Sequence, residues 1–108
     1  MKRMMVSYKV KANLAAENQQ YIEKVFEELR RTNPAGLRYA SFKQSDGVTF
    51  VHLVSVETES GNNPLHDSSA FQAFQAGIKD RCEEQPVGTE LEEVGSYQFF
   101  GDIVSSGL

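Results

Sequence analysis

Two histidines are the side chains in this sequence best suited to proton transfer near neutral pH. His66 precedes a predicted helix, where an imidazole can bind a ligand group or move a proton, although a solvated loop histidine without a role is the alternative. His52 lies inside an apolar stretch, where burial would favour the neutral ring and let it orient a substrate. A hydrogen-bonded structural histidine is the other interpretation of His52. Both are candidate catalytic residues.

Further polar side chains fall among apolar positions of the predicted elements. By helical projection Asn18 lies inside an apolar arc, so its amide needs a ligand, a main-chain carbonyl or a water as partner. Arg81 lies similarly on a second helix, where it could meet an anionic group in a cleft or extend to solvent. Tyr8, Tyr39 and Tyr97 offer hydroxyls that suit a pocket rim, a core or a dimer interface equally well. The predicted ligand-pocket residues are Asn18, Tyr8, Phe26, Phe71, Phe74 and Arg81.

Composition narrows the classes of partner and cofactor. The chain has 108 residues, a net charge of −4 and scattered basic residues, which disfavours nucleic acid because a phosphate-binding surface needs concentrated cations. The single cysteine, Cys82, has no neighbour to complete a disulfide or a metal site, which fits a reducing compartment. No apolar run is long enough to span a membrane. We therefore expect a soluble, cytoplasmic protein with no metal and no cofactor.

Side-chain periodicity predicts the elements that position these residues. Residues 6–10 alternate apolar and polar side chains, which indicates a strand with one buried face. A helix with an apolar period of 3.6 residues follows from Leu14, with Asn13 as its N-cap, and it ends at residues 33–36. Residues 37–43 form the next predicted strand.

The middle of the chain predicts the return arm of a hairpin. An Asp-Gly turn, in which glycine can take a positive φ, leads into residues 48–56. This strand has apolar side chains on both faces. The polar stretch at residues 57–67 is a loop that is long for a compact domain.

A second helix and a last strand complete the pattern. Ser68 and Ser69 precede the helix, with a capping box at residues 69–72. Pro86 and a following glycine end this helix. Residues 90–100 predict the final strand, in which the alternation slips and indicates a bulge.

This order of elements predicts a ferredoxin-like α+β domain, βαββαβ, in which a four-stranded antiparallel sheet carries two helices on one face. We expect a single domain over residues 1–108, with a core at 6–100 and a flexible tail at 101–108. The central strand is apolar on both sides, so the sheet face without helices needs a cover. A second copy of the chain is the economical cover, since closed twofold assemblies are the commonest oligomers.

Residues 65–74 carry a family resemblance. Their sequence, Leu-His-Asp-Ser-Ser-Ala-Phe-Gln-Ala-Phe, places a histidine before a helix that contains phenylalanines. Together with the order of elements over residues 6–100, this resembles the antibiotic-biosynthesis-monooxygenase-like branch of the dimeric α+β barrel superfamily. The resemblance implies two sheets that pair into a dimeric α+β barrel. It also implies one pocket per subunit between helices and sheet, lined by aromatic side chains and His66.

Two departures from the family pattern bear on the activity. The sequence has no tryptophan, whereas many catalytic members carry one near the end of the third strand. The pattern of the haem-degrading members includes an asparagine on the first strand. This chain has Ser7 and Tyr8 there, so haem degradation is disfavoured. We interpret the chain as a cofactor-independent monooxygenase-like enzyme for a small apolar or aromatic molecule. The alternative is a non-catalytic small-molecule-binding or structural homodimer.

Overall fold

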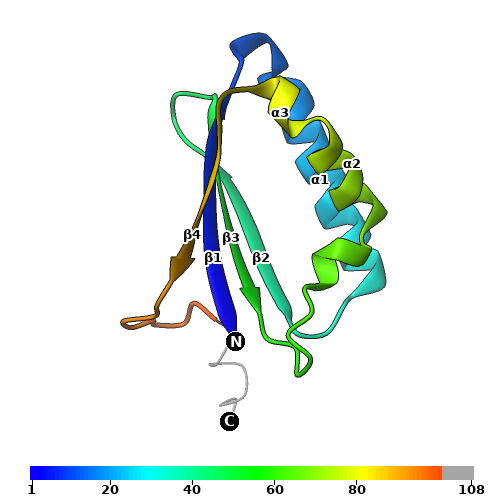
Figure 1. The fold of residues 1–108 in the computed structure, drawn as a ribbon, viewed down its shortest axis with the longest axis vertical. Helices are drawn as coiled ribbons and strands as arrows, with labels where there is room; N and C mark the ends of the chain where they lie inside the picture. The colour runs from blue at the N-terminus through cyan, green and yellow to red at the C-terminus, as the bar shows by residue number, and fades with distance from the viewer. Residues whose placement is uncertain (101–108) are drawn as a thin grey trace.

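A four-stranded antiparallel sheet with all helices on one face organises residues 1–100, the part of the chain that this computed structural model describes (Figure 1). In chain order the elements are β1 (Lys2–Val10), η1 (Ala12–Leu14), α1 (Ala15–Thr32), β2 (Leu37–Lys43), β3 (Thr49–Val56), η2 (Pro64–Asp67), α2 (Ser69–Ala76), α3 (Ile78–Arg81) and β4 (Cys82–Leu91). The predicted ferredoxin-like α+β architecture is confirmed.

The strand order is β2-β3-β1-β4, so the apolar strand predicted at residues 48–56 is confirmed as a central strand, at 49–56. Antiparallel register sets His52 of β3 opposite Val6 of β1 on one side and opposite Ser41 of β2 on the other. Tyr8 lies opposite Phe50. Because side chains alternate across a strand, all these residues share one sheet face.

The core lies between that sheet face and the helices. The apolar arc of α1 buries Ile22 and Val25 against the sheet, as its 3.6-residue period predicts. Aromatic rings fill much of the remaining space: Tyr8 stacks on Phe50 with centroids 5.7 Å apart, and Phe74 of α2 lies 6.3 Å from Tyr8. The opposite face of the sheet carries no helix (Figure 1).

The β2–β3 turn is held by Asp46, as an Asp-Gly turn predicts. Its Oδ1 accepts hydrogen bonds from the backbone N–H groups of Val48 and Thr49, at 3.0 and 2.9 Å. Gly47 has φ +77°, a conformation in which a Cβ would be strained. The turn therefore fixes the register that places Ser41 opposite His52.

The N-terminus of α2 is capped from two directions. Ser68 Oγ accepts from the N–H of Phe71 at 3.0 Å, so the predicted Ser68 cap is confirmed. The predicted capping box at residues 69–72 is wrong, because Gln72 donates its amide to the His66 carbonyl instead. Glu28 of α1 accepts from the N–H of Ala70 at 2.8 Å, and this hydrogen bond is the main cause that lowers the pKa of Glu28.

The start of α1 also differs from the prediction. Asn13 lies within η1 and caps nothing, because the helix begins at Ala15 and Leu14 occupies the N-cap position. The N–H of Leu14 donates to the carbonyl of Lys11 at 2.9 Å. In this tight turn the N–H of Leu14 has a backbone acceptor, although the helix start has no side-chain cap.

The last third of the chain differs most from the predicted order of elements. The helix predicted to end at Pro86 ends at Ala76, and after the short α3 the chain enters β4, which includes Pro86. Residues 92–100, predicted as the second part of the final strand, contain no strand. β4 pairs only with β1, so it is an edge strand, where a proline without an N–H is tolerated.

The pairing of β4 with β1 is irregular. Register shifts occur between Ser7 and Lys9 and between Lys9 and Val10, each matched by one extra residue on β4. The bulge predicted near the start of residues 90–100 is therefore wrong in place, since the irregularity lies earlier in β4.

Two further predictions concern the C-terminal tail and a membrane-spanning segment. The tail predicted at residues 101–108 lies outside the described residues. Within residues 1–100, no helix combines the length and the apolar character that a membrane crossing needs.

Candidate ligand cleft and buried polar chain

A chain of hydrogen bonds runs through the core with His52 at its centre. Nε2 of His52 lies 2.8 Å from the Tyr8 hydroxyl, and Nδ1 lies 2.7 Å from the hydroxyls of both Tyr39 and Ser41. Strand register produces this arrangement, since Ser41 is directly opposite His52 and Tyr39 is two residues away on the same face of β2.

The helices supply the other half of the chain. Asn18 of α1 donates from Nδ2 to the Tyr8 hydroxyl at 3.0 Å. Arg81 of α3 donates from Nε to Oδ1 of Asn18 at 3.0 Å and from Nη2 to the carbonyl of Phe74 at 2.8 Å. Asn18, Tyr8, His52 and Arg81 are each at most 4% exposed. We call Tyr39, Ser41, His52, Tyr8, Asn18 and Arg81 the buried polar chain.

Arg81 is a buried cation without a carboxylate partner among the described residues. Oxygens of Asn18 and Phe74 accept from its guanidinium, and its carbon atom Cζ lies 4.5 Å from the ring centroid of Tyr21. An aromatic face and carbonyl dipoles both attract a positive charge, and the attraction grows in a low-dielectric interior. These groups compensate for the water that Arg81 loses.

The remaining groups of the chain are neutral at pH 7. Burial lowers the pKa of His52 to about 4, because a charged ring is disfavoured away from water. Burial raises the pKa of Tyr39 to about 12. Burial also raises the pKa of Tyr8, although the hydrogen bond from Asn18 opposes that rise. Arg81 therefore carries the one charge of the buried polar chain.

The chain reaches a cleft at the β2 edge of the sheet. This α1–β2 cleft has a volume of about 310 Å³ and is lined by Gln19, Ile22, Glu23, Phe26, Ser41, Phe42, Lys43 and Phe50. Phe26 also lines an adjoining cavity of about 170 Å³ together with Tyr39, on whose ring it stacks with centroids 4.9 Å apart. The apolar wall of the cleft thus meets Ser41 at the end of the buried polar chain, while Tyr39 lines the adjoining cavity. This arrangement suits a small apolar ligand with one polar group.

Solved structures share this architecture, whereas no family model and no curated protein matches the sequence. A putative antibiotic biosynthesis monooxygenase from Nitrosomonas europaea superposes with a TM-score of 0.70 at 15% identity, covering 86% of this chain and 89% of that one. A structure described as an antibiotic biosynthesis monooxygenase gives a TM-score of 0.71 at 14% identity, covering 88% and 100%. This chain has the fold of the antibiotic-biosynthesis-monooxygenase-like proteins. A putative member from Caulobacter crescentus, at 17% identity and TM-score 0.67, covers 87% and 90% of the two chains.

Within this monooxygenase-like fold, the structure brings most of the predicted site residues together, but not around an open pocket. His52, Asn18, Tyr8 and Arg81 are linked by hydrogen bonds. Phe74 packs in the same core. None of these five lines the α1–β2 cleft. Their burial places them behind the cleft wall.

The other predicted residues are distributed around the helices. Phe26 lines the cleft, and Phe71 packs edge-on against Tyr39 with centroids 6.5 Å apart. His66 lies in η2 with an exposed side chain and does not line the cleft. Its backbone carbonyl accepts a hydrogen bond from the side-chain amide of Gln72. This contact supports the local fold and does not involve the imidazole.

Ser41 is the site residue that the sequence analysis did not identify. A signal for it was present, because alternation in residues 37–43 places Ser41 on the same face as Tyr39. The hairpin turn then sets that face beside His52. A serine in a short, mixed strand has no distinguishing mark until that register is known.

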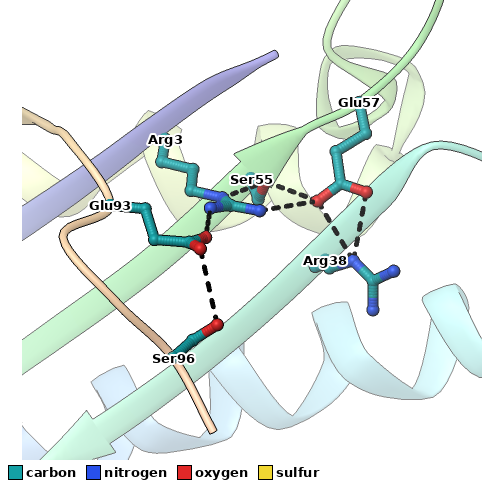
Figure 2. A network of polar contacts seen from close by, with 6 residues as sticks. All are labelled: Arg3, Arg38, Ser55, Glu57, Glu93 and Ser96. Carbon is teal, nitrogen blue, oxygen red and sulfur yellow. Dashed lines mark hydrogen bonds and ion pairs between the residues drawn. The ribbon is translucent and has the colours of Figure 1, made fainter. Parts of the chain in front are cut away.

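A separate cavity, the outer-face cavity, lies on the sheet face without helices. It has a volume of about 240 Å³ and is lined by Arg3, Met4, Arg38, Tyr39, Ala40, Leu53, Val54, Ser55, Leu91, Phe99 and Phe100. Figure 2 shows the polar network beside it: Arg3 pairs with Glu93 and lies 3.6 Å from Glu57, and Arg38 Nε lies 3.0 Å from Glu57. Every cation of this network has a carboxylate partner, so the outer-face cavity offers little free charge to a ligand.

Within residues 1–100, no three His, Cys, Asp or Glu side chains lie close enough together to hold a metal ion. Cys82 is buried and reduced, and burial raises the pKa of its thiol.

Proposed function

We propose that this protein is a cofactor-independent monooxygenase-like enzyme that binds a small apolar or aromatic molecule in the α1–β2 cleft. One observation carries the proposal: the cleft joins an apolar wall of Ile22, Phe26 and Phe50 to the Ser41 hydroxyl, which lies 2.7 Å from a buried, neutral His52. The fold shared with structures described as monooxygenases supports the same reaction class.

The reaction that fits such a cleft uses the electrons of the substrate itself. An activated methylene group loses two hydrogens and gains one oxygen as a carbonyl, and the second oxygen atom of O₂ leaves as water. The substrate carbon is oxidised by four electrons and O₂ is reduced by the same four. A hydroxyl that donates to an oxygen of the substrate stabilises the anion formed when the methylene loses its proton.

We also propose that the enzyme is a homodimer that pairs through the sheet face without helices. On this face, Phe42 and Val87 are 50% and 64% exposed, and Met5, Val51 and Leu53 are only partly buried. A second copy of the same face would cover these side chains, and twofold pairing is the commonest assembly.

Oxygen uptake with a panel of anthrones and quinols tests the proposed reaction. We expect turnover by the wild-type chain and a loss on the order of 100-fold when Ser41→Ala and Tyr39→Phe are combined. The pair Ser96→Ala and Tyr97→Phe, at exposed positions, is the matched control. His66→Ala is measured in parallel, because the imidazole of His66 is the other group suited to proton transfer near neutral pH. A loss confined to His66→Ala, or no uptake by any variant, contradicts the proposed cleft.

A non-catalytic small-molecule-binding or structural dimer is the second candidate. The observation that favours it is the completeness of the core: every buried side-chain nitrogen and oxygen in residues 1–100 has a hydrogen-bond partner. A network in which every buried polar atom has at least one partner suits stability as well as catalysis. Ligand binding without oxygen uptake would support this candidate.

A further inference from the structure

The direction of each hydrogen bond in the buried polar chain follows from Arg81. A guanidinium has only donors, so the atom of Asn18 that faces Arg81 Nε is its carbonyl oxygen. The Asn18 amide nitrogen must then face Tyr8 and donate to its hydroxyl oxygen. The orientation of this amide is therefore set by a residue 63 positions away.

The Tyr8 hydroxyl passes this direction on to His52. Its oxygen accepts from Asn18, and its hydrogen has Nε2 of His52, 2.8 Å away, as its acceptor. Nε2 is therefore the unprotonated nitrogen of the ring. A neutral imidazole has one N–H, so the proton of His52 is on Nδ1.

The position of that proton decides what the cleft offers to a ligand. Nδ1 of His52 faces two hydroxyls, those of Tyr39 and Ser41. If Nδ1 accepted, one hydroxyl would donate to Nδ1 and the other could donate to the first, which would use both hydrogens. Because Nδ1 donates, the ring N–H and the two hydroxyls together carry three hydrogens. Only two of these can be donated within the group of three. One hydroxyl hydrogen is left over, and Ser41, which carries one of the two hydroxyls, lines the α1–β2 cleft together with Phe26.

We propose that Arg81 and Asn18 are positioning residues that hold His52 as its Nδ1–H tautomer, so that the cleft presents a hydroxyl donor to a carbonyl or phenolate oxygen. The ligand class rests on the proposed function, since it assigns the occupant of the same cleft. The tautomer does not rest on it. The substrates that fit are aromatic ketones and quinol-type anions, rather than plain hydrocarbons or amines.

Nitrogen NMR of histidine rings tests the tautomer directly. The chain has two histidines, so ¹⁵N-histidine labelling gives two rings, and His66→Gln identifies the signals of the exposed one. At pH 8 we expect the protonated nitrogen of His52 to be Nδ1. A protonated Nε2 in the wild-type chain overturns the proposal.

Asn18→Asp tests whether Arg81 and Asn18 set the tautomer. The new carboxylate keeps the shape of the amide and pairs with Arg81, but it has no hydrogen to give to Tyr8. The Tyr8 hydroxyl must then donate to the carboxylate and accept from His52, so the ring proton is expected to move to Nε2. Asn62→Asp, at an exposed loop position, is the control and leaves the ring unchanged. An unchanged ring in Asn18→Asp overturns the positioning role.

A pair of matched probes tests the ligand class. 1-Tetralone carries an aromatic ring and one ketone, and tetralin has the same skeleton without the oxygen. We expect the wild-type chain to bind the ketone roughly three- to tenfold more tightly, and the combined Ser41→Ala and Tyr39→Phe variant to lose this preference. Equal binding of both probes by the wild-type chain overturns the assigned class. Binding of neither contradicts the assigned class and the proposed function together, while the ring signals still decide the tautomer.

Discussion

Arg81 and Asn18 meet through a hydrogen bond of 3.0 Å in a part of the core where both side chains are almost fully buried. The contact joins α3 to α1 and, through Tyr8 and His52, both helices to the centre of the sheet. A buried charge of this kind is costly to leave unpartnered, so the packing of the two helices depends on the network as well as on apolar contacts.

Removing the Tyr8 hydroxyl is expected to break this network at its middle. Tyr8→Phe leaves the Asn18 amide and Nε2 of His52 without partners inside the core. We expect a loss of about 2 kcal/mol in the free energy of unfolding, measured by urea denaturation at pH 7. Tyr97→Phe, at a position 85% exposed, should change this free energy by less than about 0.5 kcal/mol. Equal effects of the two changes would show that the network does not stabilise the fold.

Gly77→Ala is expected to displace Arg81. A Cβ at Gly77 would lie 2.8 Å from Nη1 of Arg81, closer than such contacts allow. Because the guanidinium is already held by Asn18 and Phe74, we expect a destabilisation of about 1–3 kcal/mol in thermal or urea unfolding. Gly88→Ala is the matched control, since its Cβ would lie an ordinary 3.6 Å from Met4. A neutral Gly77→Ala would mean that the guanidinium moves freely.

Stability is expected to fall on mild acidification because of His52. The folded pKa is about 4 and the unfolded value about 6.5, so the unfolded chain binds the additional proton between these limits. The contribution is complete above pH 6.5 and is lost as the pH falls towards 4. Between pH 6.5 and 4.5 we expect a loss of roughly 2–3 kcal/mol in the free energy of unfolding.

His52→Gln provides the comparison for this pH dependence, since its side chain does not titrate. The slope of stability between pH 6.5 and 4.5 should be much smaller in this variant than in the wild-type chain. Glu28, Glu57 and Asp46, whose pKa values are lowered by hydrogen bonds, contribute at lower pH. Parallel slopes in both chains would contradict the burial of a neutral His52.

The proposed homodimer is tested by a charge on the sheet face without helices. Leu53 is an outward-facing apolar residue of β3, and Leu53→Glu would place a carboxylate in the proposed contact. Light scattering at micromolar concentration should give a dimer for the wild-type chain and a monomer for this variant. Gln20→Glu, exposed on α1, should remain dimeric. A monomeric wild-type chain contradicts the proposed assembly.

Much of the fold was predictable because strong periodicity coincided with burial. The alternation in β1, the apolar faces of β3 and the apolar arc of α1 all record contacts that the residues make. β4 was missed for the opposite reason: nine of its ten residues are exposed at the sheet edge and carry no apolar pattern. The aromatic residues at 97–100 gave a stronger strand signal, although Tyr97 and Phe99 are largely exposed.

The candidate site could be predicted only in part. Asn18 and Arg81 were recognisable as polar residues at buried helical positions, and His52 as a polar residue on an apolar strand. Their mutual contacts depend on how α1 and α3 sit on the sheet, which no local pattern specifies. The cleft at Ser41 depends on hairpin register and on the gap beside Phe26, both of which are tertiary properties.

A crystal structure with 1-tetralone bound would show directly whether the α1–β2 cleft is the binding site. We expect the ring of the ligand against Phe26 and Phe50, and its ketone oxygen about 3 Å from the hydroxyl of Ser41 or Tyr39. A ligand found only in the outer-face cavity between Arg3 and Phe100, or beside His66, would contradict this expectation.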